Sequence, residues 1–397
     1  MDWKSATSKG EEAVSIPKRW LHLHYYEALN ILFRMENALR VFVYVILKNE
    51  FKDKWTETAM QTSEGEQSTI AATAAMRIAQ AKGFGYLGYE ISSPLMHLNS
   101  GELTRLITSD AYWTLFLRYF KGKKEIIRTK LDEVGTVRNS LAHFRPIKYD
   151  DIELIKQNVK HAFVGIEECL AEMTRTHNVV PTNTEEDWYK ALITLGTDLC
   201  GLQLYQSKRE EWVRVEVTYS CPILTKQQYG EDFFYYRVLN LLSPAVVRQF
   251  PELARLCIYV AEFVPYATMG KDFNPTFRKN ASLVFSRTVL KAEYQGIQAQ
   301  LQNLLLKIQS ESELVQKDNL ARGVLVESVY ANAQLRKGEG NQAWWWPNSS
   351  TLNCSFGEDD PPEYWGGIGL YHSDFIAGSN KYPWMPSDIS GVENPFD

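Results

Sequence analysis

The chain has 397 residues, of which 45% are hydrophobic and 23% charged, and its formal net charge is −5. This length and composition indicate a globular protein of two domains and argue against a disordered chain. The five cysteines are scattered and form no Cys-x-x-Cys pair, which argues against a disulfide framework or a zinc site and favours the cytoplasm. The longest apolar run, residues 41–47, is too short to cross a bilayer, so we expect no membrane association.

Apolar residues recur at helical spacing through the first 178 residues. The pattern predicts helices over 18–50, 69–82, 101–122 and 124–144, and a last one from Asp150 or Asp151 to Thr176. Gly83 should end the second helix and Pro146 the fourth. Residues 83–99 are expected to form a loop, and their Gly-x-Gly-x-x-Gly spacing is not a dinucleotide site because no strand precedes it. The fold class expected for residues 15–178 is an α-helical bundle.

After a linker over residues 177–186, the pattern changes to that of an α+β domain. Alternation of apolar and polar residues predicts strands over 212–219, 281–292 and 323–333. Helices are expected over 187–205, 231–257 and 293–316. We place this second domain at residues 187–337, without a recognised family, and expect it to sense a trigger or to select the target.

Residues 338–397 form an acidic, aromatic C-terminal segment. They contain nine acidic residues and a single lysine, together with Trp344, Trp345, Trp346, Trp365 and Trp384. Disordered tails are poor in aromatic residues, so we expect this segment to pack on the rest of the chain. Its simplest role is to cover an exposed apolar face of the second domain.

One segment gathers most of the reactive chemistry: Val-Arg138-Asn139-Ser-Leu-Ala-His143-Phe-Arg145. Histidine exchanges a proton near neutral pH, and the arginine fork suits the oxygens of a phosphate. Asn139 and His143 are four residues apart, which places them on one face of a helix. Arg138 lies five residues before His143 and is turned away unless the helix breaks. A solvated helix face is the simpler interpretation of such a pattern.

A basic run precedes this segment. Residues 118–130 hold six cations and one acid, which predicts a track for a nucleic-acid backbone, although most such runs are solvated surface. The residues that we expect to contact this backbone are Lys121, Lys123, Lys124, Arg128, Lys130 and, beyond the run, Arg145.

Arg-Asn-x-x-Ala-His, late in a helical N-terminal segment, resembles the Arg-x-x-x-x-His motif of the HEPN superfamily of ribonucleases. The resemblance covers about residues 15–178. It implies metal-independent RNA cleavage that leaves a 2′,3′-cyclic phosphate, at a site built from two motifs of a homodimer. It also implies a toxin or anti-phage defence role, with a phage or host trigger acting on the second domain.

The resemblance assigns catalytic roles to Arg138, Asn139 and His143, and by position to Glu36 on the first helix. A surface pair of Glu36 with Arg40 is an equally good interpretation of that residue. Family members that are silenced by a nucleotidyltransferase partner carry a tyrosine at the position of Arg145. The resemblance therefore does not imply this mode of regulation for the present chain. We expect no cofactor and no metal, because carboxylates and histidines do not cluster at ligand spacing.

Two alternatives remain open at this point. The N-terminal domain is a non-catalytic HEPN interaction module whose partner domain carries the function, or the acidic C-terminal segment occupies the RNA site and restrains the nuclease.

Overall fold

The structure is a computed structural model that describes residues 25–62, 64–84, 93–143, 145–174, 181–182, 184–265, 267–269, 274–318, 321–338, 343–348, 350–357 and 359–367. The predictions for residues 15–24, 85–92 and 368–397, which include Trp384, lie outside these ranges. No helix in the described ranges is long and apolar enough to cross a membrane.

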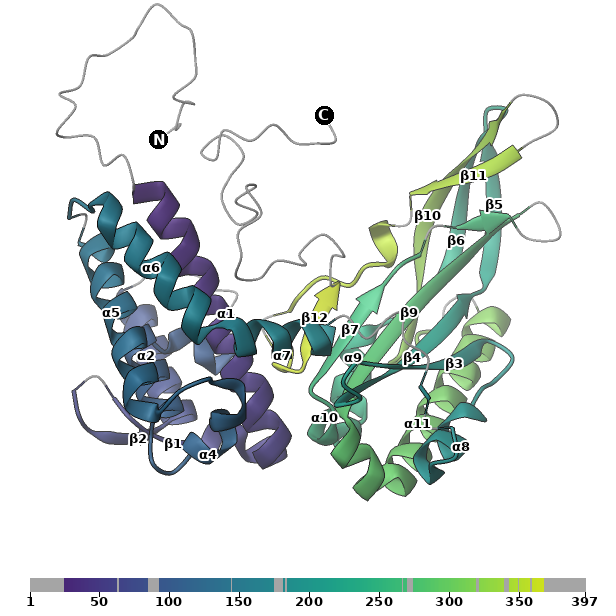
Figure 1. The fold of residues 1–397 in the computed structure, drawn as a ribbon. Helices are drawn as coiled ribbons and strands as arrows, with labels where there is room; N and C mark the ends of the chain where they lie inside the picture. Colours follow the sequence, from purple (N-terminus) through teal and green to yellow (C-terminus); the bar gives the residue numbers. More distant parts are fainter. Residues whose placement is uncertain are drawn as a thin grey trace, which may run out of the picture.

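The N-terminal half is mainly helical (Figure 1). Its central helix α1 is buried along most of its length, with Phe42, Val43 and Leu47 completely inaccessible to solvent. The elements of this half are α1 (Tyr25–Phe51), η2 (Lys52–Glu57), β1 (Ala59–Gln61), β2 (Gln67–Thr69), α2 (Ile70–Phe84), η3 (Pro94–His97), α3 (Ser100–Ile107), α4 (Trp113–Phe116), η4 (Leu117–Tyr119), α5 (Lys124–Ala142), α6 (Tyr149–Ala162) and α7 (Val164–Thr174).

Local sequence explains where several of these elements begin and turn. Asn99 caps α3 by accepting a hydrogen bond from the backbone N–H of Glu102, whose side chain accepts one from the N–H of Asn99 in return. Gly65 adopts a positive φ of 88° in the turn that joins β1 to β2. Gly165 lets η4 approach α7, because a Cβ atom at this position would lie 1.9 Å from the Tyr119 carbonyl oxygen.

The C-terminal half contains two antiparallel sheets with one parallel strand pair. The six-stranded sheet has the order β12-β7-β9-β4-β3, with β8 paired to β9, and the four-stranded sheet has the order β11-β10-β6-β5. The elements are α8 (Asp187–Ile193), β3 (Cys200–Gln206), β4 (Trp212–Cys221), β5 (Ile223–Tyr229), β6 (Phe233–Leu241), α9 (Ser243–Gln249), α10 (Pro251–Leu256), β7 (Tyr259–Phe263), β8 (Thr268–Met269), β9 (Pro275–Ser286), α11 (Arg287–Lys317), β10 (Val326–Lys337), β11 (Ala343–Asn348), η6 (Ser350–Leu352) and β12 (Tyr364–Gly367).

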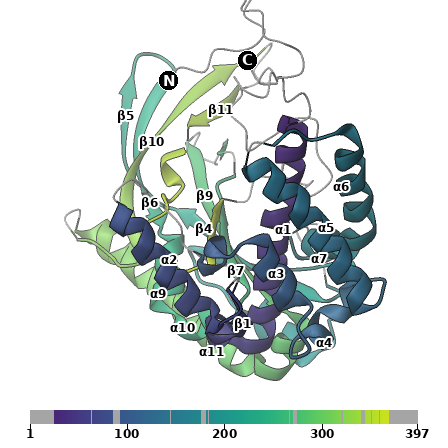
Figure 2. The ribbon, with the colours of Figure 1, turned by 90° about the vertical axis from the view of Figure 1, so that its left-hand side faces the viewer.

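The six-stranded sheet is buried on both faces, because successive side chains of a strand point to opposite sides. On β9, Leu283 and Phe285 join the core that contains α11, whereas Val284 joins the core of the N-terminal helices. Tyr259 and Ala261 of β7 also belong to the N-terminal core. The two halves therefore share a core, and Figures 1 and 2 show α7 and α1 lying beside the strands.

Polar contacts connect the same two halves. Tyr44 of α1 donates a hydrogen bond to the Ile258 carbonyl oxygen at 2.6 Å, and the buried Lys48 ammonium lies 2.5 Å from a Glu363 carboxylate oxygen. The Trp365 ring stacks on Tyr259 with ring centroids 4.2 Å apart, and it also contacts the Tyr44 ring of α1, with centroids 5.9 Å apart. Residues just before and within β12 thus fix the sheet to the first helix.

The predicted fold class is wrong. We expected an α-helical bundle followed by an α+β domain, but the described residues form a mixed structure, about 52% helix and 26% strand, with three sheets. The hairpin β1–β2 lies inside the region expected to be all helical. The helices also pack on a sheet rather than only on one another. Short strands escape periodicity because three residues are too few to show alternation.

Individual elements were predicted unevenly. The helix at 124–144 and the strand at 212–219 are confirmed by α5 and β4, but the helix expected over 231–257 is wrong. That segment contains the strand β6, rich in aromatic and branched residues, and two short helices with a proline in the first turn, Pro244 in α9 and Pro251 in α10. Likewise, the helix expected from Asp150 or Asp151 to Thr176 is interrupted at Phe163.

The expected C-terminal segment is not an appendage within the described residues. Ala343–Asn348 pairs with β10, so the boundary expected at 337/338 falls inside a hairpin. Tyr364–Gly367 pairs with β7 and completes the six-stranded sheet. The segment therefore supplies edge strands to both sheets instead of covering a finished domain.

Candidate functional site

Helix α5 carries the Arg-Asn-x-x-Ala-His motif. Its buried stripe consists of residues three and four apart, namely Ile127, Leu131, Val134, Val137 and Leu141. This stripe packs against α1, α3 and α6. Arg138 borders the stripe and is partly buried, whereas Asn139 and His143 are exposed. Packing of α5 thus divides the motif between two faces.

Glu36 of α1 lies beside Arg138. Its Oε2 atom is 3.7 Å from Arg138 Nε, and its Oε1 atom is 2.5 Å from Arg40 Nη2. The Glu36 carboxylate therefore bridges two guanidinium groups while only 13% of its side chain is exposed. Glu36 therefore lies next to the motif, as the resemblance suggested, and it also forms the local pair with Arg40.

Arg40 is held more deeply than Arg138. Its guanidinium donates hydrogen bonds to the carbonyl oxygens of Leu95 and Leu98 and to Asn37. Burial lowers the pKa of Arg40, Glu36 opposes this shift, and the positive charge of Arg138 adds to it. Arg40 thus fixes the Glu36 carboxylate at the position where it meets Arg138.

His143 is the residue at which α5 ends. Its backbone N–H donates to the Asn139 carbonyl oxygen at 3.2 Å, and its φ and ψ of −99° and 14° leave the helix. Within the described part of the chain, the side chains of Asn139 and His143 have no hydrogen-bond or ion-pair partner. Both imidazole and amide are therefore open to a ligand.

Arg138 and His143 do not converge within one chain. Five residues of α-helix rotate the side-chain direction by about 140°. The Arg138 side chain is directed to Glu36, and His143 lies on the exposed side with Asn139. For an arginine and a histidine of this motif to contact the same phosphate, one of the two side chains must therefore come from another molecule, such as a second copy of the chain.

The structure divides the six residues predicted to bind RNA into three groups. Lys124 pairs with Asp110, and the Nε atom of Arg128 lies 3.7 Å from a carboxylate oxygen of Asp132. Lys123 is exposed at the start of α5, and Arg145 is exposed just after its end. Lys121 and Lys130 instead line a pocket.

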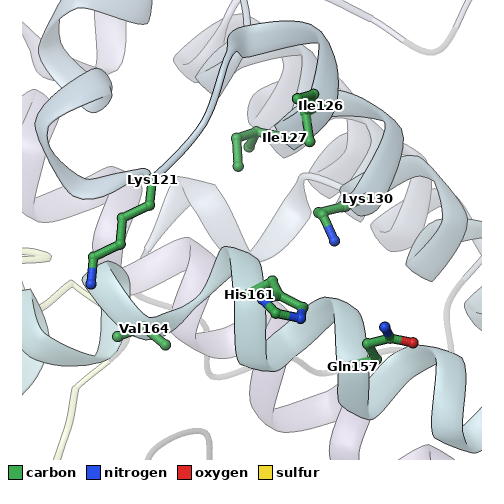
Figure 3. Close-up of a pocket in the computed structure, with 7 residues that line it drawn as sticks. All are labelled: Lys121, Ile126, Ile127, Lys130, Gln157, His161 and Val164. Carbon is green, nitrogen blue, oxygen red and sulfur yellow. The ribbon is translucent and has the colours of Figure 1, made fainter.

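This pocket, of about 400 Å³, opens between the start of α5 and the helices α6 and α7 (Figure 3). Lys121, Lys130, Gln157 and His161 supply its polar lining, and Ile126, Ile127 and Val164 supply its apolar lining. Among the described residues, the side chains of Lys121, Lys130 and His161 have no ion-pair or hydrogen-bond partner. Such a lining suits an anion that carries an apolar or aromatic part.

Sequence reasoning did not find His161 or Gln157. They are four residues apart on α6, so they share a face, but nothing in the sequence indicated that this face meets the start of α5. The pocket and the motif lie at opposite ends of α5. From Lys130 to His143 the helix rises about 20 Å, which is about six phosphates of a stacked strand.

No group of three His, Cys, Asp or Glu side chains in the described ranges is arranged to hold a metal ion. No family model, curated protein or solved structure matches the chain. The HEPN resemblance is therefore carried by the motif residues alone.

Proposed function

We propose that this protein is a metal-independent RNA endonuclease of the HEPN type. The observation that supports the proposal most is the exposed His143 and Asn139 at the end of α5, with Arg138 on another face of the same helix, where Glu36 holds it at 3.7 Å. These side chains are a proton carrier, an amide and a phosphate-binding cation, which is the set that RNA cleavage by its own 2′-hydroxyl requires.

In the proposed reaction, the ribose 2′-oxygen attacks the adjacent phosphorus and the bond from phosphorus to the 5′-oxygen breaks. His143 takes the 2′-hydroxyl proton, and the protonated His143 of a second copy of the chain donates a proton to the departing 5′-oxygen. The products are a 2′,3′-cyclic phosphate and a 5′-hydroxyl. Arg138 stabilises the charge on the phosphate oxygens, and Asn139 orients the phosphate or the imidazole.

One histidine cannot serve both proton transfers in the same turnover without changing its own protonation state between them. We infer that a homodimer places two copies of His143 and two of Arg138 around one phosphate, which also brings the two faces of α5 together. The proposal further includes a cytoplasmic toxin or anti-phage defence role, with a phage or host trigger acting through the C-terminal half.

A specific observation favours a second candidate function. Arg138 is engaged by Glu36 and turned away from His143, as in a motif that has only a structural role. A non-catalytic module that mediates assembly is the corresponding alternative. It predicts a dimer without nuclease activity.

The decisive test is cleavage of RNA by the purified full chain in the presence of EDTA. We expect cutting to continue with chelator, to yield 2′,3′-cyclic ends, and to fail on a substrate whose 2′-hydroxyl is replaced by hydrogen. Activity that is lost with EDTA and restored by magnesium would contradict the mechanism. A soluble dimer that cuts no RNA under any of these conditions would favour the assembly module.

A further inference from the structure

The four-stranded sheet has one buried face, and its opposite face is open over the part that carries residues 233–237 of β6. Farther along the same side, Leu239, Leu241 and Val326 are buried. Its register places Phe234 and Tyr236 of β6 and Trp345 of β11 on the side of the hydrophobic core, where all three are buried. Alternate residues of the same strands point the other way. We call the side that carries Tyr235 of β6 and Tyr330 of β10 the outer face.

The outer face is unusually aromatic. It carries six rings, one or two on each strand: Tyr229, Phe233, Tyr235, Tyr330, Trp344 and Trp346. All but Phe233 are between 41% and 69% exposed, so these rings do not contribute a closed core. Scattered single aromatics on a surface need no explanation, but six on one face of one sheet indicate a binding surface.

The polar residues among these rings are cations, amides and the hydroxyls of Thr225 and Ser328. Arg237 and Arg336 lie on this face, with the amides Gln227, Asn332 and Gln334. No register position on the outer side of these four strands holds a carboxylate. Asp232, in the turn before β6, lies 3.4 Å from Lys337. The charge of the face therefore suits a polyanion.

Contacts with one another and with arginine hold several of these rings in place. The Arg336 guanidinium lies over the Trp346 ring at 4.4 Å, and Tyr235 makes edge contacts with Tyr229 and Phe233 at 5.9 and 5.2 Å between ring centroids. Arg237 donates hydrogen bonds to Ser328 on the neighbouring strand at 2.9 and 3.1 Å, which fixes its position between the rings.

We propose that the outer face binds single-stranded RNA. Bases stack on Tyr235, Tyr330 and Trp346, and Arg237 and Arg336 contact the phosphates. Base stacking on aromatic side chains of a sheet, next to cations for the backbone, is the physical means by which proteins hold unpaired nucleic acid. The proposal rests on the proposed function for the choice of RNA as the ligand and names the surface of this ribonuclease that takes its substrate.

The test measures binding apart from cleavage. The full chain carrying His143→Ala is titrated against a labelled single-stranded RNA of about 12 nucleotides, a length within the range of such surfaces. A hairpin duplex and a neutral oligosaccharide serve as competitors. The variants are Tyr330→Ala, Tyr330→Leu, Tyr330→Phe and Trp346→Ala. Phe263→Ala is the matched control, because this ring is 46% exposed but lies on the other sheet.

We expect each of Tyr330→Ala, Tyr330→Leu and Trp346→Ala to weaken binding by about 5- to 150-fold. Tyr330→Phe and Phe263→Ala should retain wild-type affinity, because one keeps the stacking ring and the other lies off the surface. The duplex should compete poorly, since its bases are not available for stacking. Circular dichroism and melting curves should be the same for all variants, because the substituted rings are exposed.

Unchanged affinity in Tyr330→Ala and Trp346→Ala would overturn the proposal, as would preferential binding of the oligosaccharide. A loss of self-association in these variants without a loss of RNA binding would also overturn it and assign the face to a second copy of the chain. The two proposals fail differently. If the wild-type chain binds RNA through the aromatic rings but never cuts it, only the proposed nuclease activity is contradicted. If the wild-type chain cuts RNA but its binding does not depend on the rings, only the proposed role of the outer face is contradicted.

Discussion

The Glu36 carboxylate on α1 lies 3.7 Å from the Arg138 guanidinium on α5. The two residues are about a hundred positions apart in the chain, and the same carboxylate also contacts Arg40. Glu36 therefore sets the direction of Arg138 from a neighbouring helix. We propose that Glu36 positions Arg138 and does not touch the substrate.

We expect Glu36→Gln to lower both stability and activity. The two guanidinium groups would lose the charge between them, and a charged hydrogen bond at such a partly buried site is worth about 1.5–3 kcal/mol. Chemical denaturation should show a loss of this size. Cleavage should fall further than the loss of folded protein explains, because Arg138 loses its orientation.

Glu50→Gln is the matched control, since this carboxylate is exposed near the end of the same helix. If Glu36→Gln and Glu50→Gln behave alike, Glu36 is merely part of a surface pair. Recovery of activity in a Glu36→Asp variant would support the positioning role.

We expect His143→Ala to abolish cleavage without changing the melting temperature. The side chain is exposed and has no partner among the described residues, so its removal leaves the packing intact. Loss of a positioned proton carrier lowers the rate by about 10²–10⁴. Arg138→Ala should be similarly inactive, and Arg138→Lys should recover little, because an ammonium does not replace the planar fork.

Lys317→Ala at the end of α11 serves as the surface control and should cut normally. Normal cleavage by a soluble His143→Ala protein would remove the assignment of this motif as the catalytic site.

The cations of the basic run should contribute unequally to RNA binding. Lys121 and Lys130 line the pocket without an ionic partner among the described residues, whereas Lys124 and Arg128 are paired with Asp110 and Asp132. Reversal of Lys121 and Lys130 to glutamate should weaken RNA binding and reduce the slope of log K against log salt by about 1.4. Reversal of Lys124 and Arg128 should have a smaller effect, because these charges are already partly compensated.

Filter binding at several salt concentrations measures both quantities. Equal slopes for the two double variants would show that the pocket makes no special contact with the phosphate backbone.

We expect a chain ended at residue 337 to be insoluble or unfolded. It would lack β11 and β12, including the buried Trp345 and Tyr364 rings, and would leave Lys48 buried without Glu363. Removing a large buried ring costs about 3–5 kcal/mol, and an unpaired buried charge costs about as much. The sum reaches the whole stability of an ordinary protein, about 5–15 kcal/mol.

A chain ended at residue 367 is the comparison, since it keeps every contact described here. It should remain soluble and retain its cleavage rate. A soluble chain ended at 337 with raised cleavage would instead favour a segment that restrains the nuclease.

The local sequence pattern predicted a helix or strand correctly where the element is long and its neighbours are close in sequence. The spacing of Ile127, Leu131 and Val134 predicted α5, and the alternation from Trp212 to Tyr219 predicted β4. The same reasoning failed for β6, whose residues 233–241 were expected to be helical. That strand is defined by partners on β10, about ninety residues later, and such pairing leaves little trace in the local sequence.

The sequence by itself determined the chemistry that is available: the His, Asn and Arg of one motif, its basic run and the absence of a cysteine framework. Only the tertiary structure decided which groups meet. Packing of α1 on α5 brought Glu36 to Arg138, packing of α6 placed His161 beside two lysines, and strand register collected the aromatic rings on one face. The physical reason is the difference in the sequence separation over which these effects act. Residue type and spacing act over a few residues, whereas these sites depend on contacts between segments that only folding brings together.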